Sequence, residues 1–98
     1  MKFANYIRYV EDQDAVAAIR STHRAYLHGL LEGGQLAAAG PFADGSGALF
    51  IYEAGDIGTA RGLAEADPYT LGGVIKQQTI TPWDLVYSNL ALLRQPGQ

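Results

Sequence analysis

Apolar residues recur along this chain with two different periods, and the order of those periods restricts the possible folds more than any other feature. A period of two residues indicates a strand, and a spacing of three to four residues indicates a helix. The expected elements are strand 2–10, helix 15–33, strands 35–40 and 48–53, helix 57–66 and strand 74–81. This β-α-β-β-α-β order predicts an α+β, ferredoxin-like fold, in which two helices cover one face of a four-stranded antiparallel sheet.

Local signals mark the ends of the two expected helices. Asp14 and Asp56 are the expected N-caps, because a short polar side chain can accept a hydrogen bond from the first turn. Gly33 and Gly34 end the first helix, as glycine often does. Pro68 disfavours helical geometry at Asp67, so the second helix should stop there.

The 98 residues fit one domain, with a core over 1–83 and a C-terminal extension over 84–98 that begins after Pro82-Trp83. Strand 2–10 places apolar or aromatic side chains on both of its faces, and the helices cover only one of them. The extension is too short to cover the other face alone. We therefore expect a homodimer in which two subunits pack sheet against sheet, because an apolar sheet face is unfavourable in water.

Charge and composition exclude several kinds of partner. The net charge is −3 and the seven Lys and Arg residues are scattered, whereas nucleic acids and anionic membranes both require clustered basic residues. No apolar run approaches the roughly 18 residues of a membrane span. The N-terminal residues alternate in polarity and lack the continuous apolar core of a signal peptide. We expect a cytoplasmic protein that binds neither nucleic acid nor membrane.

We expect neither a metal nor an organic cofactor. The chain has no cysteine, which excludes disulfides, thiol nucleophiles and thiolate metal ligands. His28 follows His23 by five residues, roughly 140° around a helix at about 100° per residue, so it should point to solvent. Two histidines share a metal ion on one helix face when they are four residues apart. No phosphate-binding loop or dinucleotide fingerprint is present.

His23 is the residue that most clearly suggests chemistry. It lies at the centre of the apolar stripe of the first helix. The members of this stripe are Val16, Ile19, His23, Tyr26, Leu27 and Leu30. A buried imidazole needs a polar partner. Either His23 is a core residue satisfied by a backbone carbonyl or by Tyr26, or it is a functional acid or base.

Asp67 is the candidate partner for His23. An aspartate before proline is common at helix ends, so a structural role would explain Asp67 on its own. A carboxylate that accepts a hydrogen bond from an imidazole fixes its tautomer and favours the protonated ring. If the expected fold brings the two side chains together, they form an acid/base pair.

The sequence resembles the YCII-related (YciI-like) family of small dimeric α/β barrels. Matching segments extend over nearly the whole chain as far as Trp83. They are Arg20 to Leu27 with its R-x-x-H pattern, Gly34 and Leu36 leading into Gly40-Pro41, Asp44 and Gly47, Ala60, Ala66 to Tyr69 with its D-P-Y pattern, and Pro82-Trp83. The resemblance implies a ferredoxin-like dimer with a His–Asp catalytic pair at His23 and Asp67. It also implies relatives that act on small ring compounds, including dehydrochlorination of a chlorinated hydroxyhydroquinone.

Four further residues are candidates for substrate binding. Arg20 lies one turn before His23 and could bind an anionic group, or it could be an ordinary exposed arginine. Gly40 and Pro41 belong to a segment that could offer backbone N–H groups to an oxyanion, although turn geometry also explains such glycines. Tyr69 follows Asp67 closely and could orient a phenolic or carboxylate ligand.

These residues favour a cofactor-independent enzyme, a lyase, isomerase or hydrolase, in which His23 and Asp67 transfer protons on a small anionic or phenolic compound. The alternative is a dimeric binding or accessory module without chemistry, because the chain offers one candidate histidine, no thiol and no nucleophile elbow. Dimeric barrel monooxygenases share this type of fold, and only that analogy favours them.

Overall fold

The computed structural model describes residues 1–94 and confirms the expected order of strands and helices. It adds a short helix, α3, and a 3-10 turn, η1, near the C-terminus. The elements are β1 (Lys2–Tyr9), α1 (Gln13–Glu32), β2 (Leu36–Pro41), β3 (Gly47–Glu53), α2 (Ile57–Glu65), α3 (Pro68–Leu71), β4 (Ile75–Trp83) and η1 (Leu90–Leu93).

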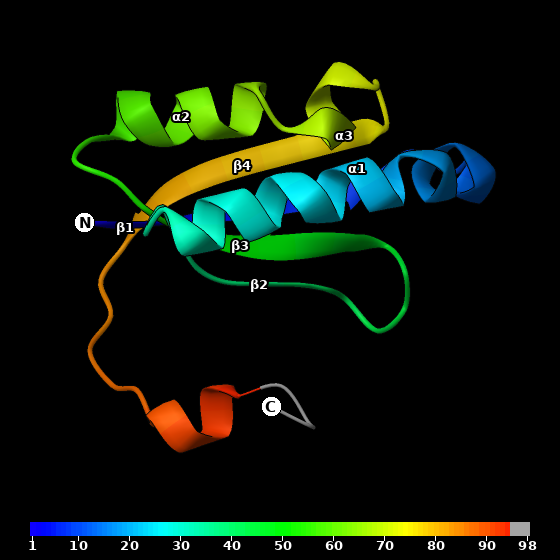
Figure 1. The fold of residues 1–98 in the computed structure, drawn as a ribbon. Coiled ribbons are helices and arrows are strands. Elements are labelled where there is room, and N and C mark those ends of the chain that lie inside the picture. Colours follow the sequence, from blue (N-terminus) through cyan, green and yellow to red (C-terminus); the bar gives the residue numbers. More distant parts are fainter. Residues whose placement is uncertain (95–98) are drawn as a thin grey trace.

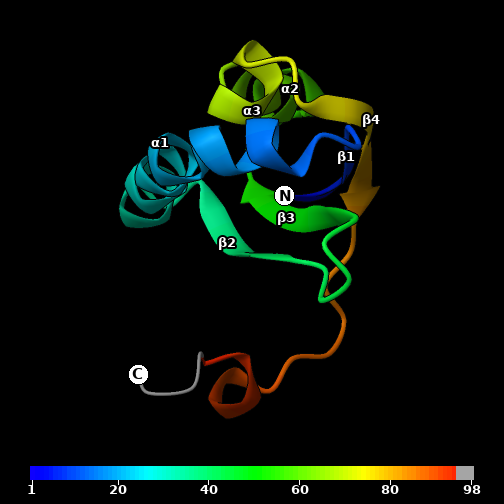
Figure 2. The same ribbon diagram turned by 90° about the vertical axis from the view of Figure 1, so that its right-hand side faces the viewer.

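The four strands form one sheet in the order β2-β3-β1-β4, and every neighbouring pair is antiparallel. All three helices lie on one side of this sheet, with α1 beside α3 and with α2 leading into α3 (Figures 1 and 2). The expected ferredoxin-like α+β fold is therefore confirmed. β2 and β4 are the edge strands, and β1, the first strand in the sequence, is central.

The alternation expected for β1 separates the two faces of the sheet. Phe3, Asn5 and Ile7 are buried beneath the helices, whereas Ala4 and Tyr6 point to the opposite face and are only half-buried. We call these the helix-covered face and the outer face. The buried apolar residues of the core are Phe3, Ile7, Val16, Leu30, Leu36, Ala48, Phe50, Tyr52, Ala60, Ala64, Tyr69 and Val74.

The start of the first helix differs from the prediction. Asp12 is its N-cap, not Asp14, and the Asp12 carboxylate accepts a hydrogen bond from the backbone N–H of Ala15 at 3.1 Å. Asp14 lies in the first turn instead, where a negative charge still interacts favourably with the helix dipole. The predicted cap of α2 is confirmed, since Asp56 accepts from the N–H of Thr59 at 2.7 Å.

The last strand is longer than predicted. The expected strand ends at residue 81, before Pro82 and Trp83. They belong to β4, where they lie opposite Phe3 and Lys2 of β1. A proline is compatible with this position because β4 is an edge strand and need not donate a hydrogen bond on its free side. Of the predicted extension 84–98, residues 95–98 lie outside the described residues. None of the described helices has the length and apolar character required to cross a membrane.

Gly47 provides a test of how closely the sheet is packed. A Cβ atom at this buried position would overlap the carbonyl oxygen of Ile7 on the neighbouring strand. We expect Gly47→Ala to lower the free energy of unfolding by at least about 2 kcal/mol, because backbone would have to move. Gly62 in α2 is the control, since a Cβ there meets no atom within 4 Å. Gly62→Ala should stabilise the protein by about 0.5–1 kcal/mol. Chemical denaturation measures both, and equal stability of the two variants would contradict this packing.

Candidate active site

α1 turns His23 into the protein. The three buried residues of this 20-residue helix are Val16, His23 and Leu30, which are seven residues, or about two turns, apart. His23 is only 5% exposed. The prediction that the imidazole faces the core is therefore confirmed, and its polar partner comes from a distant part of the sequence.

That partner is Asp67, held in place by the start of α3. α2 ends at Glu65, and Pro68 occupies the first turn of α3, a position that suits its fixed φ. Asp67 is the N-cap, and its Oδ1 accepts a hydrogen bond from the N–H of Tyr69 at 2.7 Å. Its Oδ2 lies 3.1 Å from Nε2 of His23. One buried carboxylate thus caps one helix and holds the imidazole of another.

Two aromatic rings fix the plane of the imidazole. The ring of Tyr69 stacks on His23 with centroids 3.8 Å apart and planes inclined by 15°. Phe50 of β3 contacts it from another direction, with centroids 5.5 Å apart and planes inclined by 60°. Tyr69, predicted as a pocket residue, therefore lies directly against His23, whereas Phe50 could be predicted only as a member of a strong strand.

The contact with Asp67 determines which ring nitrogen is free. An ionised carboxylate can only accept hydrogen bonds, so Nε2 of His23 donates and the lone pair of the neutral ring is on Nδ1. Nδ1 makes no hydrogen bond to any of residues 1–94, and it is not among the fully buried polar atoms that lack a partner. This nitrogen is therefore available at the small exposed edge of the ring.

Tyr26 has a different partner from the one considered in the sequence. Its hydroxyl donates to the backbone carbonyl of Leu63 at 2.6 Å and so ties α1 to α2. The interpretation in which Tyr26 satisfies His23 is therefore wrong. Deeper in the core, the side-chain amide of Asn5 donates to the hydroxyl of Tyr52 at 3.1 Å, while Oδ1 of Asn5 is buried without a partner among the described residues.

Tyr9 is a neighbour of the pair that sequence reasoning did not select. Its ring meets Tyr69 edge-on at 5.4 Å. Burial, and then the nearby Tyr69, raise the pKa of Tyr9 to about 12, whereas the positive charge of Arg20 acts in the opposite direction. Arg20 is exposed, its charge acts on Tyr9, and among residues 1–94 it forms no hydrogen bond with His23 or Asp67. The available signal was the period of two residues along β1, which places Tyr9 on the same face as Asn5 and Ile7.

The other predicted binding residues are not brought to His23. Gly40 and Pro41 lie in the edge strand β2, where they pair with Leu49 and Ala48, and not in a loop. Both are exposed, and among residues 1–94 neither forms a hydrogen bond with His23 or Asp67. A role for Gly40 and Pro41 in binding stays a prediction without support from the geometry.

His28 points away from the pair. It is exposed on the far side of α1, where its Nε2 lies 3.0 Å from the carboxylate of Glu32, one turn later. The predicted surface position is confirmed. Across residues 1–94, no three His, Asp or Glu side chains are grouped closely enough to hold a metal ion.

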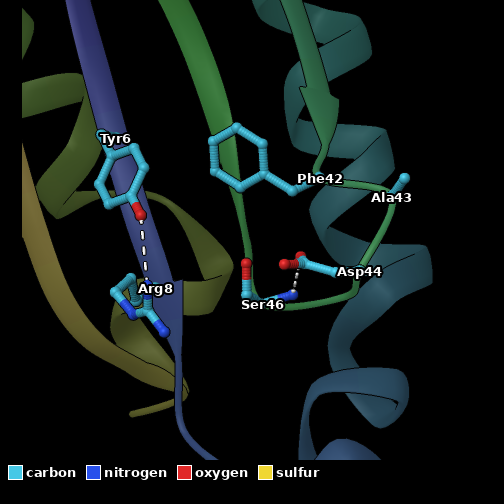
Figure 3. Close-up of a pocket in the computed structure, with 6 residues that line it drawn as sticks. All are labelled: Tyr6, Arg8, Phe42, Ala43, Asp44 and Ser46. Atoms are coloured by element: carbon cyan, nitrogen blue, oxygen red, sulfur yellow. Dashed lines mark hydrogen bonds between the residues drawn. The ribbon is translucent and has the colours of Figure 1, made fainter.

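The outer face of the sheet carries an open hollow of about 450 Å³ at its hairpin end (Figure 3). Its lining residues are Tyr6, Arg8, Phe42, Ala43, Asp44 and Ser46. Arg8 lies 3.4 Å from the hydroxyl of Tyr6, and Asp44 accepts from the N–H of Ser46 at 2.9 Å. Because the sheet separates Tyr6 from the helix-covered face, this hollow is not an entrance to His23 and Asp67.

Comparison with known proteins places this geometry in a family. Residues 1–84 match the model of the YCII-related domain. The chain belongs to the YCII-related family. A similar solved structure is 5-chloro-2-hydroxyhydroquinone dehydrochlorinase from Burkholderia phenoliruptrix AC1100, in complex with 2,5-dihydroxybenzoquinone. It is 22% identical with a TM-score of 0.76, over 86% of this chain and 94% of that one. No curated protein matches the chain.

The two roles of Asp67 can be separated by stability measurements. Asp67→Ala removes a cap and also leaves His23 buried without its partner, so we expect a loss of about 2–4 kcal/mol in the free energy of unfolding. Asp12→Ala is the matched control, because Asp12 caps α1 in an exposed position and contacts no buried group. Its expected cost is about 1 kcal/mol. Equal losses in urea denaturation would mean that the contact between His23 and Asp67 contributes nothing to stability.

Tyr9 should make the protein less stable in strong alkali. Its pKa is about 12 in the folded chain against an ordinary value of 10.0. Neutral Tyr9 therefore favours folding at all pH values below about 10, and this contribution is lost as the pH rises from 10 to 12. Between about pH 9 and pH 11.5, the stability of Tyr9→Phe should fall less steeply than that of the wild type. A curve for Tyr9→Phe that is as steep as that of the wild type over this range would contradict the prediction.

Proposed function

We propose that this protein is an enzyme that needs no cofactor and that uses His23 and Asp67 as an acid/base pair on a small phenolic or anionic compound. The observation that carries the proposal is the buried contact of 3.1 Å between Nε2 of His23 and Oδ2 of Asp67, which leaves Nδ1 free. A purely structural histidine would gain more from having both ring nitrogens satisfied.

In this mechanism His23 takes up a proton through Nδ1. Asp67 stabilises the imidazolium that forms, because its carboxylate already accepts from Nε2. The stacked ring of Tyr69 keeps the imidazole in the plane that this contact requires. The protonated ring then returns its proton to the product or to the leaving group, so that His23 acts first as base and then as acid.

An elimination from a hydroxylated ring fits this arrangement. His23 would remove the proton of a ring hydroxyl, the O–H electron pair would form a carbonyl, and the ring carbon that carries the leaving group would take up this proton from the imidazolium. His23 would then remove the proton of a second hydroxyl, whose electron pair would form a second carbonyl while the leaving group departs as an anion with the electrons of its bond to carbon. The net change is the loss of one acid, HX, without any oxidant or reductant. The dehydrochlorinase with a similar fold is named for a reaction of this class and holds a quinone as its ligand, which supports a hydroxylated ring as the substrate.

Arg20 and Tyr69 are the proposed ligand contacts. Arg20 is exposed beside Tyr9, so its guanidinium could neutralise a phenolate or carboxylate that approaches the pair from the surface. Tyr69 offers the face of its ring and a hydroxyl. Since His23 is only 5% exposed, the substrate would contact the edge of the imidazole and not its face.

The low exposure of His23 also favours a second candidate function. A ligand-binding or accessory module without chemistry would need the same buried contact only to shape its pocket. Neither of the hollows described over residues 1–94 is lined by His23 or Asp67, so the pair is less open than most active sites.

We further propose that the protein is a homodimer through the outer face of its sheet. This face carries Tyr6, Ile51 and Leu49 in its centre, side by side on β1 and β3, with little charge among them. Leu49 is 38% exposed. A contiguous apolar face on a protein of this size is typical of an interface between subunits.

A panel of hydroxylated and chlorinated hydroquinones tests the proposed chemistry. With any compound that is turned over, His23→Gln should lower kcat/KM by about 10²–10⁴-fold, because the proton acceptor is lost. His28→Gln is the matched control and should leave kcat/KM unchanged, since His28 is exposed on the other side of α1. Removal of metals with EDTA should have no effect.

Two results would contradict the proposal that this protein is an enzyme. Equal turnover by wild type and His23→Gln would exclude the imidazole as the reacting group. No turnover by the wild type, together with ligand binding that survives in His23→Gln, would favour the binding module instead. Thermal denaturation of each variant distinguishes lost chemistry from lost folding.

A further inference from the structure

The chain leaves a long apolar segment uncovered after β4. Every residue from Asp84 to Arg94 is exposed, and we call this segment the C-terminal arm. Its six large apolar side chains are 44% to 92% exposed: Leu85, Val86, Tyr87, Leu90, Leu92 and Leu93. No charged residue lies between Asp84 and Arg94. Monomeric proteins rarely expose contiguous apolar patches larger than about 300–600 Å², so this arm needs a surface on which to pack.

The body of the same chain does not provide that surface. A backbone hydrogen bond within the arm joins Leu92 to Asn89, and none of the backbone hydrogen bonds described in residues 1–94 ties the arm to the sheet or the helices. In both ribbon views the arm leaves the end of β4 and lies beyond β2, on the side away from α2 and α3 (Figures 1 and 2). The arm thus forms η1 without burying any of its own residues.

The arm is also an addition to what the chain shares with its family. The YCII-related match ends at residue 84, where the arm begins. The similar dehydrochlorinase structure corresponds to 86% of this chain. The surface that the arm covers is therefore a feature of this protein, beyond the fold that the family has in common.

We propose that the C-terminal arm packs on β2 of a second copy of this chain. This contact would add to the dimer through the outer face of the sheet that is proposed above, here called the sheet-face dimer. β2 is an edge strand of small residues, and Ala37 to Pro41 are all exposed. If the twofold axis runs along the strands between two facing sheets, each β4 lies over the partner's β2. The arm, which continues β4, then arrives at the partner's edge.

A second copy fits the arm better than another partner does. The arm and the outer face are both apolar. In a symmetric dimer, the contact that one subunit's arm makes with its partner is repeated by the partner's arm. A stable interface buries about 800 Å² on each subunit. The six exposed side chains of the arm add apolar surface to that of Tyr6, Leu49 and Ile51 on the outer face. A charged partner would find few complementary groups in the arm.

The absence of cysteine makes a cross-linking test unambiguous. Leu90→Cys is prepared with ¹⁵N label and Ala38→Cys without label, and the two proteins are mixed and treated with a short bismaleimide. We expect a cross-linked species of twice the chain mass that contains one labelled and one unlabelled chain. The double variant Ala38→Cys/Leu90→Cys should likewise give cross-linked dimers. If the double variant instead gives only internally linked chains of single mass, the arm folds onto its own sheet and the proposal is overturned.

Sedimentation equilibrium measures what the arm contributes to assembly. The triple variant Leu90→Gln/Leu92→Gln/Leu93→Gln should raise the dimer dissociation constant at least tenfold, while the matched polar change Asn89→Ala should leave it unchanged. A full chain that is monomeric at all concentrations would overturn both the sheet-face dimer and the arm. A full chain whose dimer is unaffected by the triple variant would overturn the arm alone. Neither result bears on the chemistry of His23 and Asp67.

Discussion

The carboxylate of Asp67 is the contact on which the proposed active site depends. One oxygen holds the N–H of Tyr69 and so starts α3, and the other holds Nε2 of His23 on α1. Because Tyr69 then stacks on the same imidazole, a single buried side chain fixes two helices and the plane of one ring. Burying a carboxylate costs free energy, and hydrogen bonds to both of its oxygens offset that cost. The cap of α3, the stack of Tyr69 on His23 and the contact between His23 and Asp67 are therefore one arrangement and should be gained or lost together.

The sheet divides the molecule into two sides with different tasks. Its helix-covered face carries two buried polar contacts, between His23 and Asp67 and between the amide nitrogen of Asn5 and Tyr52. Its outer face carries Tyr6, Leu49 and Ile51, which are only partly covered. The period-two geometry of β1 and β3 allows this division, because neighbouring residues point to opposite sides. Assembly on the outer face can therefore change without disturbing the ring of His23, and the proposed chemistry does not require the C-terminal arm.

Much of the fold and of the candidate site could be predicted from the sequence, and each prediction that was missed or wrong has a physical cause. The helical period turned His23 inward and Pro68 ended α2, so the two members of the pair could be named from local rules. Their direct contact needed the fold, since 44 residues separate them. The role of Asp67 as a cap was missed because α3 has only four residues and leaves no periodic signal. Pro82 was misplaced because proline usually ends a strand, and only the sheet order reveals that β4 is an edge. The sequence does not distinguish Tyr9 from other core aromatic residues, because its contact with Tyr69 exists only in the folded chain.

Stability and the proposed chemistry place different requirements on the buried contact of His23 with Asp67. Stability requires only that Nε2 has an acceptor, which Asp67 supplies. Catalysis requires in addition that Nδ1 stays unpaired and that the ring cannot rotate to exchange its nitrogens. The stack with Tyr69 at 3.8 Å and the contact with Phe50 oppose that rotation. A core that only needed filling could place an apolar side chain at this position without any of these constraints. An oriented imidazole with one unpaired nitrogen is thus the feature of the fold on which the proposed chemistry depends.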